Sequence, residues 1–327
     1  MKTFQFKLGA MLLAGSLIFS SCEKEETVTP TTLPELETIA EIATASGDFT
    51  ILLDALTRTG LAGVMADPSQ NLTVFAPTDA AFMDLLTELN LGSLDEVETA
   101  LGNDGLKNVL MYHVLGSKVT SSMVSTGYTA SLGTNGTMDP LSIYLNTSNG
   151  VMLNDRAMVT TADVMASNGV IHIIDKVILP LSIYQLLEVN ADYATLTAAL
   201  GIADGDLDLL MGDAMAGPFT VFAPNENAFG MLLTELMIAD VPALVAALGT
   251  DGLSEVLTYH VVAGNYNSDE VPSGAVATVN GDDITFDLTS GVVITDARMR
   301  TSDVIEVDIQ GTNGVIHAIS KVILPTP

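Results

Sequence analysis

The histidines are the residues of this chain best suited to metal binding or to acid and base catalysis, and they recur in a fixed pattern. The chain of 327 residues has four of them, at His113, His172, His260 and His317. The first and the third each follow a tyrosine, Tyr112 or Tyr259. Two histidines at equivalent places in each half would suit a metal pair or a general base. No third ligand at zinc spacing accompanies them, so we interpret all four as buried, hydrogen-bonded structural imidazoles.

Four aspartates lie near the ends of β-rich runs, where paired carboxylates would suit acid and base catalysis on a glycoside. They are Asp155 and Asp163 in the first half and Asp296 and Asp303 in the second. Glycoside hydrolysis needs two carboxyl groups at a defined separation, which a sequence alone does not set. Aspartate is also common in turns and at helix N-caps. We therefore favour a turn or capping role for these four residues.

Three further aspartates, Asp204, Asp206 and Asp208, alternate as in the opening of a calcium-binding loop. An EF-hand loop also needs glycine at its sixth position and glutamate at its twelfth, and this chain has Leu209 and Met215 there. A weak loop-type cation site is the alternative to a plain turn. The sequence contains no nucleophile elbow, phosphate-binding loop or dinucleotide fingerprint. We therefore expect no catalytic set, no cofactor and no metal, so that the protein is not an enzyme.

The elements that position these residues occur twice. The phrase TVFAPTDAAF at 73–82 returns as TVFAPNENAF at 220–229, an offset of 220 − 73 = 147. The phrase NGVIHIIDKVILP at 168–180 returns as NGVIHAISKVILP at 313–325, an offset of 313 − 168 = 145. A period of this length suits a self-sufficient domain rather than a solenoid repeat. We predict two homologous domains, residues 36–180 and 181–327, joined almost without a linker as a fairly rigid pair.

Within each domain the pattern predicts helices first and strands later. Apolar residues recur at helical spacing from Phe49 to Leu56, where Ser46 and Asp48 are candidate N-caps. Short β-rich runs broken by glycine and asparagine predict strands at 72–75, 141–145, 151–153 and 170–174. Helices and strands that are segregated along the chain indicate the α+β class rather than alternating α/β.

The charge balance is strongly acidic. Forty Asp and Glu against eleven Lys and Arg give a formal net charge of −29. Such a charge repels nucleic-acid phosphates and anionic lipid surfaces, so nucleic acid is not an expected partner. With 48% hydrophobic residues, the chain can build real cores, and we interpret the acidic residues as keeping it soluble.

The N-terminus has the features of an export signal. Lys2 and Lys7 precede an apolar stretch, 8–19, which predicts a signal peptide over residues 1–21. Cys22, the only cysteine, follows small residues at the expected cleavage site. This arrangement resembles the lipobox of bacterial lipoproteins, which implies lipidation of Cys22; an unmodified thiol is the alternative. The predicted spacer, 22–35, is rich in Thr and Pro.

The location follows from the residues next to Cys22. The sequence EKEE at 23–26 resembles the export signal of surface lipoproteins in some Gram-negative bacteria. We therefore expect the protein in the outer membrane, lipid-anchored and facing the cell exterior. A merely solvated tether is the alternative interpretation of this acidic segment.

Four ordered motifs, each present twice, make the chain similar to the fasciclin family. They are the two TVFAP phrases, the Tyr-His pairs, the stretches Asn154–Asp163 and Asp296–Asp303, and the two NGVIH phrases. The second copy departs from the first, with Ser320 where the first has Asp175 and with Glu306 and Asp308 added in a longer loop before Asn313. The resemblance implies a compact α+β unit in which helices pack on a wedge of two β-sheets.

The resemblance also implies a role in adhesion. Fasciclin-like modules are secreted or surface-anchored and bind matrix, glycans or proteins, and the family's Tyr-His pair is linked to adhesion and to domain integrity. Carried onto this chain, that implicates Tyr112, His113, Tyr259 and His260. The expected partners are extracellular matrix, polysaccharide or a cell-surface protein, and the alternative function is a glycan-binding accessory in surface polysaccharide capture.

Overall fold

The structure is a computed structural model that describes residues 36–205, 207–213, 216–289 and 291–327. Residues 36–327 form one compact unit. The predicted signal peptide, Cys22 and the Thr/Pro-rich spacer lie outside the described residues, as does Asp206 of the aspartate-rich loop. We call residues 36–180 domain 1 and residues 181–327 domain 2.

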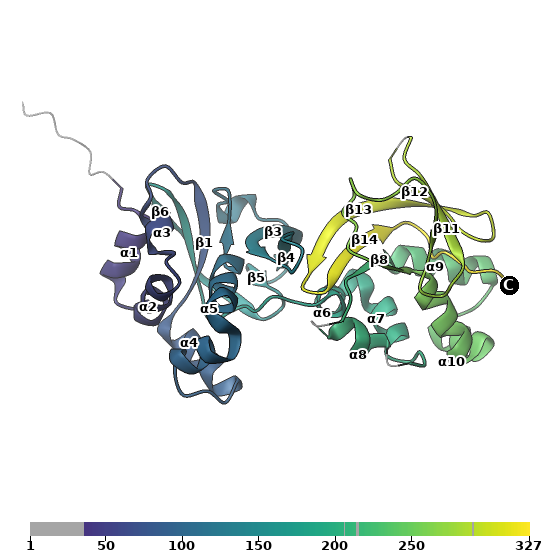
Figure 1. Ribbon diagram of the computed structural model, residues 1–327, viewed down its shortest axis with the longest axis horizontal. Coiled ribbons are helices and arrows are strands. Elements are labelled where there is room, and N and C mark those ends of the chain that lie inside the picture. Colours follow the sequence, from purple (N-terminus) through teal and green to yellow (C-terminus); the bar gives the residue numbers. More distant parts are fainter. Residues whose placement is uncertain (1–35, 206, 214–215, 290) are drawn as a thin grey trace, which may run out of the picture. The chain divides into compact units, whose positions relative to one another are not determined.

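Domain 1 begins with helices and ends with strands (Figure 1). Its helices are α1 (Ile39–Ser46), α2 (Thr50–Arg58), α3 (Ala62–Ala66), α4 (Asp79–Glu88), α5 (Leu94–Tyr112) and the short 3₁₀ helix η1 (Ser121–Met123). Its strands are β1 (Leu72–Pro77), β2 (Val114–Leu115), β3 (Gly127–Thr134), β4 (Pro140–Asn146), β5 (Met152–Leu153), β6 (Ala157–Ala166) and β7 (Gly169–Ile174).

Domain 2 repeats this order. Its helices are α6 (Ile183–Glu188), η2 (Ala191–Tyr193), α7 (Ala194–Leu200), α8 (Leu207–Gly212), α9 (Glu226–Leu236) and α10 (Val241–Tyr259). Its strands are β8 (Phe219–Pro224), β9 (Val261–Ala263), β10 (Gly274–Ala277), β11 (Asp283–Asp287), β12 (Val293–Thr295), β13 (Thr301–Gly311) and β14 (Gly314–Ile319).

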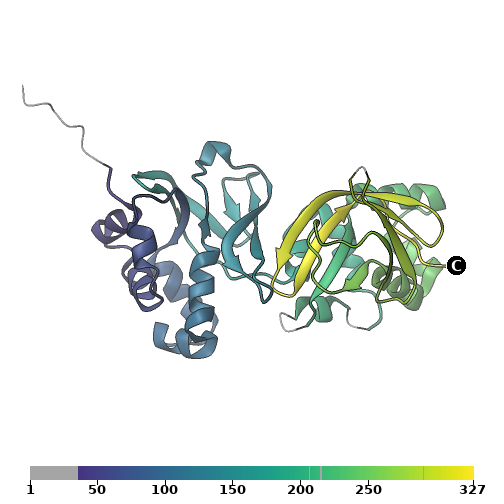
Figure 2. The same ribbon diagram turned by 45° about the horizontal axis from the view of Figure 1, so that its top comes forward.

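Each domain has one mixed sheet of seven strands, which confirms the predicted α+β class. The order in domain 1 is β2-β1-β7-β6-β5-β4-β3, and domain 2 has the equivalent order β9-β8-β14-β13-β12-β11-β10. Among the strands of the described residues, only β1 with β7 and β8 with β14 pair in parallel. The long strands β6 and β13 carry register shifts and join the two halves of each sheet, whose curvature is visible in Figure 2. The two repeated phrases therefore lie side by side as the parallel strand pair of each sheet.

Strand β1 is buried on both faces, which explains its nearly continuous apolar sequence. Val74 and Ala76 face the helices and belong to the core between helices and sheet. Phe75 points the other way, into a second core formed with Tyr112 and Ile143. Domain 2 divides its core in the same way. The sheet thus separates two small hydrophobic cores in each domain.

Helices α5 and α10 each bend at a glycine. Gly102 has φ 73° and Gly249 has φ 72°, a conformation that L side chains rarely adopt. Among the described helices, α10 is long and apolar enough to cross a membrane by length and composition. It is interrupted by Gly249 and occupies the same place in domain 2 as α5 does in domain 1.

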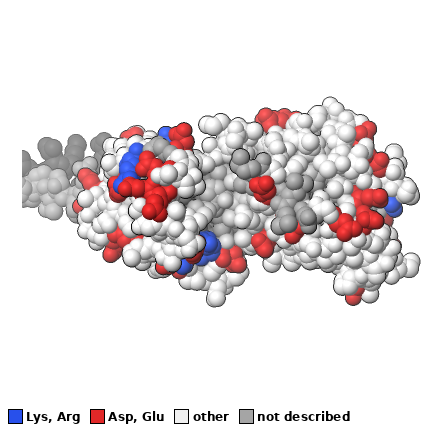
Figure 3. All heavy atoms as spheres, turned by 60° about the horizontal axis from the view of Figure 1, so that its bottom comes forward, with Lys and Arg blue, Asp and Glu red and all other residues white. Residues whose placement is uncertain are grey.

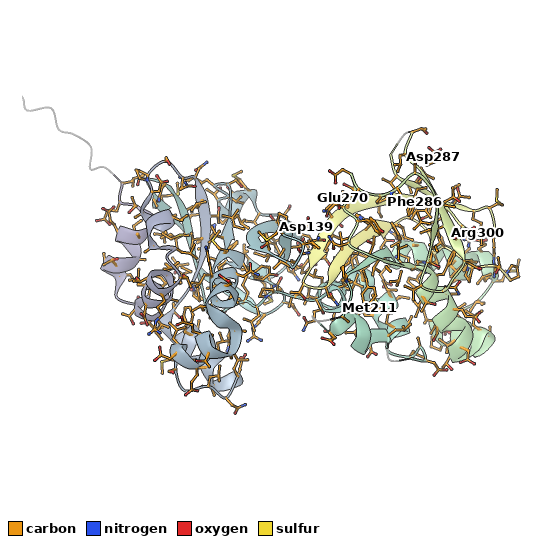
Figure 4. All side chains as sticks on the ribbon, viewed as in Figure 1. Asp139, Met211, Glu270, Phe286, Asp287 and Arg300 are labelled. Atoms are coloured by element: carbon orange, nitrogen blue, oxygen red, sulfur yellow. The ribbon has the colours of Figure 1, made fainter. Side chains whose placement is uncertain are left out.

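The two domains are joined by hydrogen bonds. The Tyr128 hydroxyl donates to the Leu186 carbonyl at 2.7 Å, and the Gln310 N–H donates to the buried Ser142 hydroxyl at 2.9 Å. Asp139, labelled in Figure 4, accepts from the side-chain amide of Asn267 at 2.8 Å. The Tyr128 ring also packs against the core of domain 2. The rigidity of the pair stays a prediction.

The prediction of the helix N-caps was wrong. Ser46 is the last residue of α1, and its hydroxyl donates to Asp48. No side chain next to α2 caps it; instead Asp79, from α4, accepts from the Ile51 N–H at 2.8 Å. Glu226 does the same for the Thr195 N–H of α7 at 2.6 Å. A carboxylate distant in sequence thus satisfies the free donors at the start of each helix.

We expect Asp79→Ala to lower the free energy of unfolding of domain 1 by about 1 kcal/mol, because the first turn of α2 loses its acceptor. Asp79→Glu is the matched control, since domain 2 already uses glutamate at this place. Chemical denaturation of the two variants measures the difference. Equal stability of wild type and Asp79→Ala would show that the distant cap is unimportant.

Candidate functional site

The Tyr-His pairs lie at the ends of the long helices. Tyr112 is the last residue of α5 and His113 is its C-cap, directly before the strand β2 that pairs with β1. Tyr259 and His260 hold the same positions at the end of α10. The four side chains are buried, with exposures of 0%, 3%, 0% and 2% in sequence order. None of them is therefore accessible to a partner at the surface.

Both imidazoles join a helix end to the segment that follows the last strand. The Nδ1 of His113 is 2.7 Å from the Val109 carbonyl, and its Nε2 is 3.1 Å from the Ile178 N–H. His260 makes the equivalent contacts, to the Val256 carbonyl at 2.7 Å and to the Ile323 N–H at 3.1 Å. Because a carbonyl accepts and an N–H donates, both rings are neutral, with the proton on Nδ1.

This environment disfavours the charged imidazole. Burial lowers the pKa of His113 to about 4, although the hydrogen bond to the Val109 carbonyl partly opposes the shift. Burial likewise lowers the pKa of His260 to about 4. A proton on Nε2 would also point at a backbone N–H and break that hydrogen bond. Both histidines therefore stay neutral near pH 7 and do not act as acids there.

The tyrosine hydroxyls hold the second sheet half against the helix end. Tyr112 donates to the Ser142 carbonyl of β4 at 2.7 Å and accepts from the Asn154 side-chain amide at 2.9 Å. Burial raises the pKa of the Tyr112 hydroxyl. Tyr259 donates to the Asp283 carbonyl at 2.8 Å and accepts from the Ala297 N–H at 2.8 Å. Both hydroxyls have a donor and an acceptor and are fully engaged.

The other two histidines are also structural, as predicted. His172 and His317 are buried in the middle of β7 and β14. Their Nε2 atoms donate to the Val119 and Tyr266 carbonyls, each at 2.9 Å. The rings stack on the phenylalanines of the neighbouring parallel strands, with centroids 5.6 Å and 5.7 Å apart.

The equivalence of Asp163 with Asp303 was wrong, and Asp308 is the structural counterpart of Asp163. Asp163 and Asp308 have φ 60° and 61°, and each donates its N–H to the Nδ1 of a buried histidine. Each carboxylate accepts from the N–H and the hydroxyl of a serine, Ser121 or Ser268. The pKa of Asp163 is lowered by these hydrogen bonds from Ser121. The sequence signal was available, because Asp163 and Asp308 both stand nine residues before the histidine.

Two further expectations about the second copy are resolved by the same comparison. The segment with Glu306 and Asp308 is strand β13 and not a loop. Ser320 replaces Asp175 and keeps its hydrogen bond, because its hydroxyl accepts the Asp303 N–H at 3.0 Å, as Asp175 accepts the Met158 N–H at 2.7 Å. The turn role predicted for Asp296 fits, since its carboxylate accepts from the Arg298 and Arg300 N–H groups.

The described residues contain no cluster of three or more His, Cys, Asp or Glu side chains that could hold a metal ion. Asp204 of the aspartate-rich loop accepts from the Thr250 hydroxyl at 2.7 Å. A hydrogen bond with Asp204 raises the pKa of the neighbouring Asp251, so two carboxyls approach each other there. Figure 3 shows acidic side chains scattered over the visible face, with few basic ones.

Comparison with known proteins agrees with this architecture. The fasciclin domain model matches residues 47–180 and 192–325, more than half of the chain. A Synechocystis protein, sll1483, is 37% identical over 145 residues, which are 44% of this chain and 74% of that protein. The transforming growth factor-beta-induced protein ig-h3 of Sus scrofa is 28% identical over 266 residues, 78% of this chain and 35% of that protein. Human periostin is 28% identical over 261 residues, 78% of this chain and 28% of that protein.

The chain therefore belongs to the fasciclin family, with two fasciclin domains in tandem. A solved structure of a FAS1 domain pair from the insect cell adhesion molecule fasciclin I is similar, with a TM-score of 0.47, 16% identity and coverage of 87% of this chain and 95% of that chain. Fasciclin domains are known in cell-adhesion proteins. The chain spans about a third of the length of ig-h3, so the activity of that whole protein does not transfer directly.

The neutral histidines make stability depend on pH. In the unfolded chain they bind a proton below their usual pKa of 6.5, whereas the folded chain binds it only near pH 4. We expect the free energy of unfolding to fall as the pH drops from about 6.5 to 4, by roughly 3 kcal/mol for each histidine. The His113→Gln variant should show a shallower slope in denaturation measured across this range. An equal slope would contradict the account.

The corrected equivalence gives a separate test in domain 2. Asp308→Ala removes the acceptor of two hydrogen bonds from Ser268, and we expect it to lower the free energy of unfolding by about 1 kcal/mol. The matched control is Asp303→Ala in the same strand, which should change it by less than about 0.5 kcal/mol. Thermal denaturation of both variants decides between the two alignments, since the reverse ranking would restore Asp303 as the counterpart.

Proposed function

We propose that this protein is a lipid-anchored, non-catalytic adhesion module on the outside of the outer membrane. The observation that carries the proposal is that the polar groups of the repeated motifs are buried and engaged with one another. The hydroxyls of Tyr112 and Tyr259 each donate one hydrogen bond and accept another inside the domain. His113 and His260 each use both ring nitrogens in the same way. A general base must reach its substrate, and these groups do not reach the surface.

Membership of the fasciclin family supports binding rather than chemistry. The expected partners are matrix proteins, surface polysaccharide or proteins of a neighbouring cell. Two domains in one chain raise a weak affinity through effective concentration. The hydrogen bonds between the domains, such as Tyr128 to Leu186, would keep the two binding surfaces at a fixed spacing.

The anchor is part of the proposal and rests on the N-terminal sequence. Lipidation of Cys22 would tether the domains through the Thr/Pro-rich spacer, since two acyl chains hold a protein firmly in a membrane. We expect Cys22→Ser to move the protein from the membrane fraction to the soluble fraction. Continued recovery of the variant in the membrane fraction would contradict the lipid anchor and leave the adhesion proposal standing.

Adhesion is tested by binding of the chain from Glu23 to Pro327 to an array of matrix proteins and polysaccharides, with and without calcium. Binding to proteins or to a second copy of the chain is the result expected for an adhesion module. Discrete glycan hits would favour carbohydrate-mediated attachment or the alternative, a glycan-binding accessory in polysaccharide capture. Turnover of an arrayed polymer would contradict both. The His113→Gln variant, if folded, should bind as wild type does, because His113 is not at the surface.

A further inference from the structure

Each domain has an apolar cavity between its two long helices and the end of the chain segment that follows the sheet. The cavity in domain 1 has a volume of about 20 Å³ and is lined by Phe82 and Leu110 among others. The equivalent cavity in domain 2 has a volume of about 110 Å³. Apolar cavities of about 150 Å³ stay dry and bind small apolar molecules such as benzene. The domain 2 cavity is therefore large enough for the end of an acyl chain.

The difference between the domains follows from their side chains. Ile51 lines the cavity in domain 1. Thr195 is the equivalent residue of domain 2, because the N–H of Ile51 donates to Asp79 and the N–H of Thr195 donates to Glu226. Thr195 turns its hydroxyl to Glu226 at 2.8 Å and does not line the cavity. The smaller, polar side chain leaves unfilled the space that isoleucine fills.

The domain 2 cavity also has a cation in its wall. Arg298 lines it, is exposed to solvent, and donates its Nε–H to the Pro325 carbonyl at 2.8 Å. Among the described residues, no carboxylate lies within ion-pairing distance of its guanidinium, while Arg300 nearby contacts both Glu235 and Asp296. The domain 1 cavity has no arginine in its wall. In a chain of net charge −29, an arginine without an acidic partner at an apolar opening is unusual.

The remaining polar group in the wall carries no charge. His260 is neutral, and both of its ring nitrogens form hydrogen bonds with backbone groups. Leu236 and Leu248 line the cavity and are 41% exposed each, so they mark its opening. The site therefore combines an apolar interior, an apolar rim and one positive charge.

We propose that domain 2 binds a small carboxylate with an apolar tail, the class of short and medium-chain fatty acids. The tail enters the cavity beneath Leu236 and Leu248, and the carboxylate pairs with the guanidinium of Arg298 at the opening. Charge complementarity selects an anion over a neutral molecule of equal length. Domain 1 does not bind it, because its cavity is filled and lacks the arginine.

The test is isothermal titration of the chain from Glu23 to Pro327 with butanoate, hexanoate, octanoate and octanol. The buried residues of the core clusters lie between Ile39 and Leu324, so this chain keeps the folded unit. We expect affinity to rise about fourfold with each methylene that the cavity buries and then to level off. Absence of saturable binding of octanoate would overturn the proposal.

Two pairs of variants locate the site. Arg298→Gln should weaken octanoate binding about fivefold and leave octanol unchanged. Leu248→Glu places a negative charge on the rim and should weaken octanoate binding at least as much, while Leu101→Glu, the equivalent exposed position of domain 1, should have no effect. Equal weakening of octanoate and octanol by Arg298→Gln, or sensitivity to Leu101→Glu in place of Leu248→Glu, would contradict the assignment.

Discussion

The hydrogen bonds of the neutral imidazoles of His113 and His260 are the interaction on which the rest of each domain depends. Each ring receives the N–H of the segment after the last strand and gives its own N–H to the preceding helical turn. The carbonyl of the same histidine accepts from the central strand, through the Phe75 or Phe222 N–H at 2.9 Å. Each histidine thus connects the long helix, the sheet and the segment after the last strand. The contacts lie in a buried site, where an unpaired polar group would cost free energy.

Much of the fold followed from the sequence because the duplication marks it twice. The apolar periodicity places the helices, and the TVFAP and NGVIH phrases are the central parallel strands. The caps from Asp79 and Glu226 were not predictable, because local rules look for a cap beside the helix and these carboxylates come from another one. The Asp163 equivalence was missed because a fixed offset from the start of the motif ignores the longer turn between β12 and β13, whereas counting back from the histidine does not.

The candidate site illustrates a wider limit of sequence reasoning. The four histidines are buried, as their apolar neighbours predicted. The structural role of the Tyr-His pairs stays a prediction. The domain 2 cavity left no such signal, because its larger volume and the place of Arg298 in its wall both depend on how the side chains pack. A cavity left by incomplete filling of a hydrophobic core can be recognised only when the packing of the side chains is known.

The most direct test of this account is an NMR titration of the imidazole groups of His113 and His260, with ¹⁵N labelling to report the tautomer. The structure predicts a proton on Nδ1, an unprotonated Nε2 that accepts a backbone N–H, and no protonation until the pH approaches 4. Titration near pH 6.5, with rapid exchange with solvent, would contradict it. The Tyr-His pairs would then be accessible groups able to meet a partner rather than the internal connection between helix and sheet.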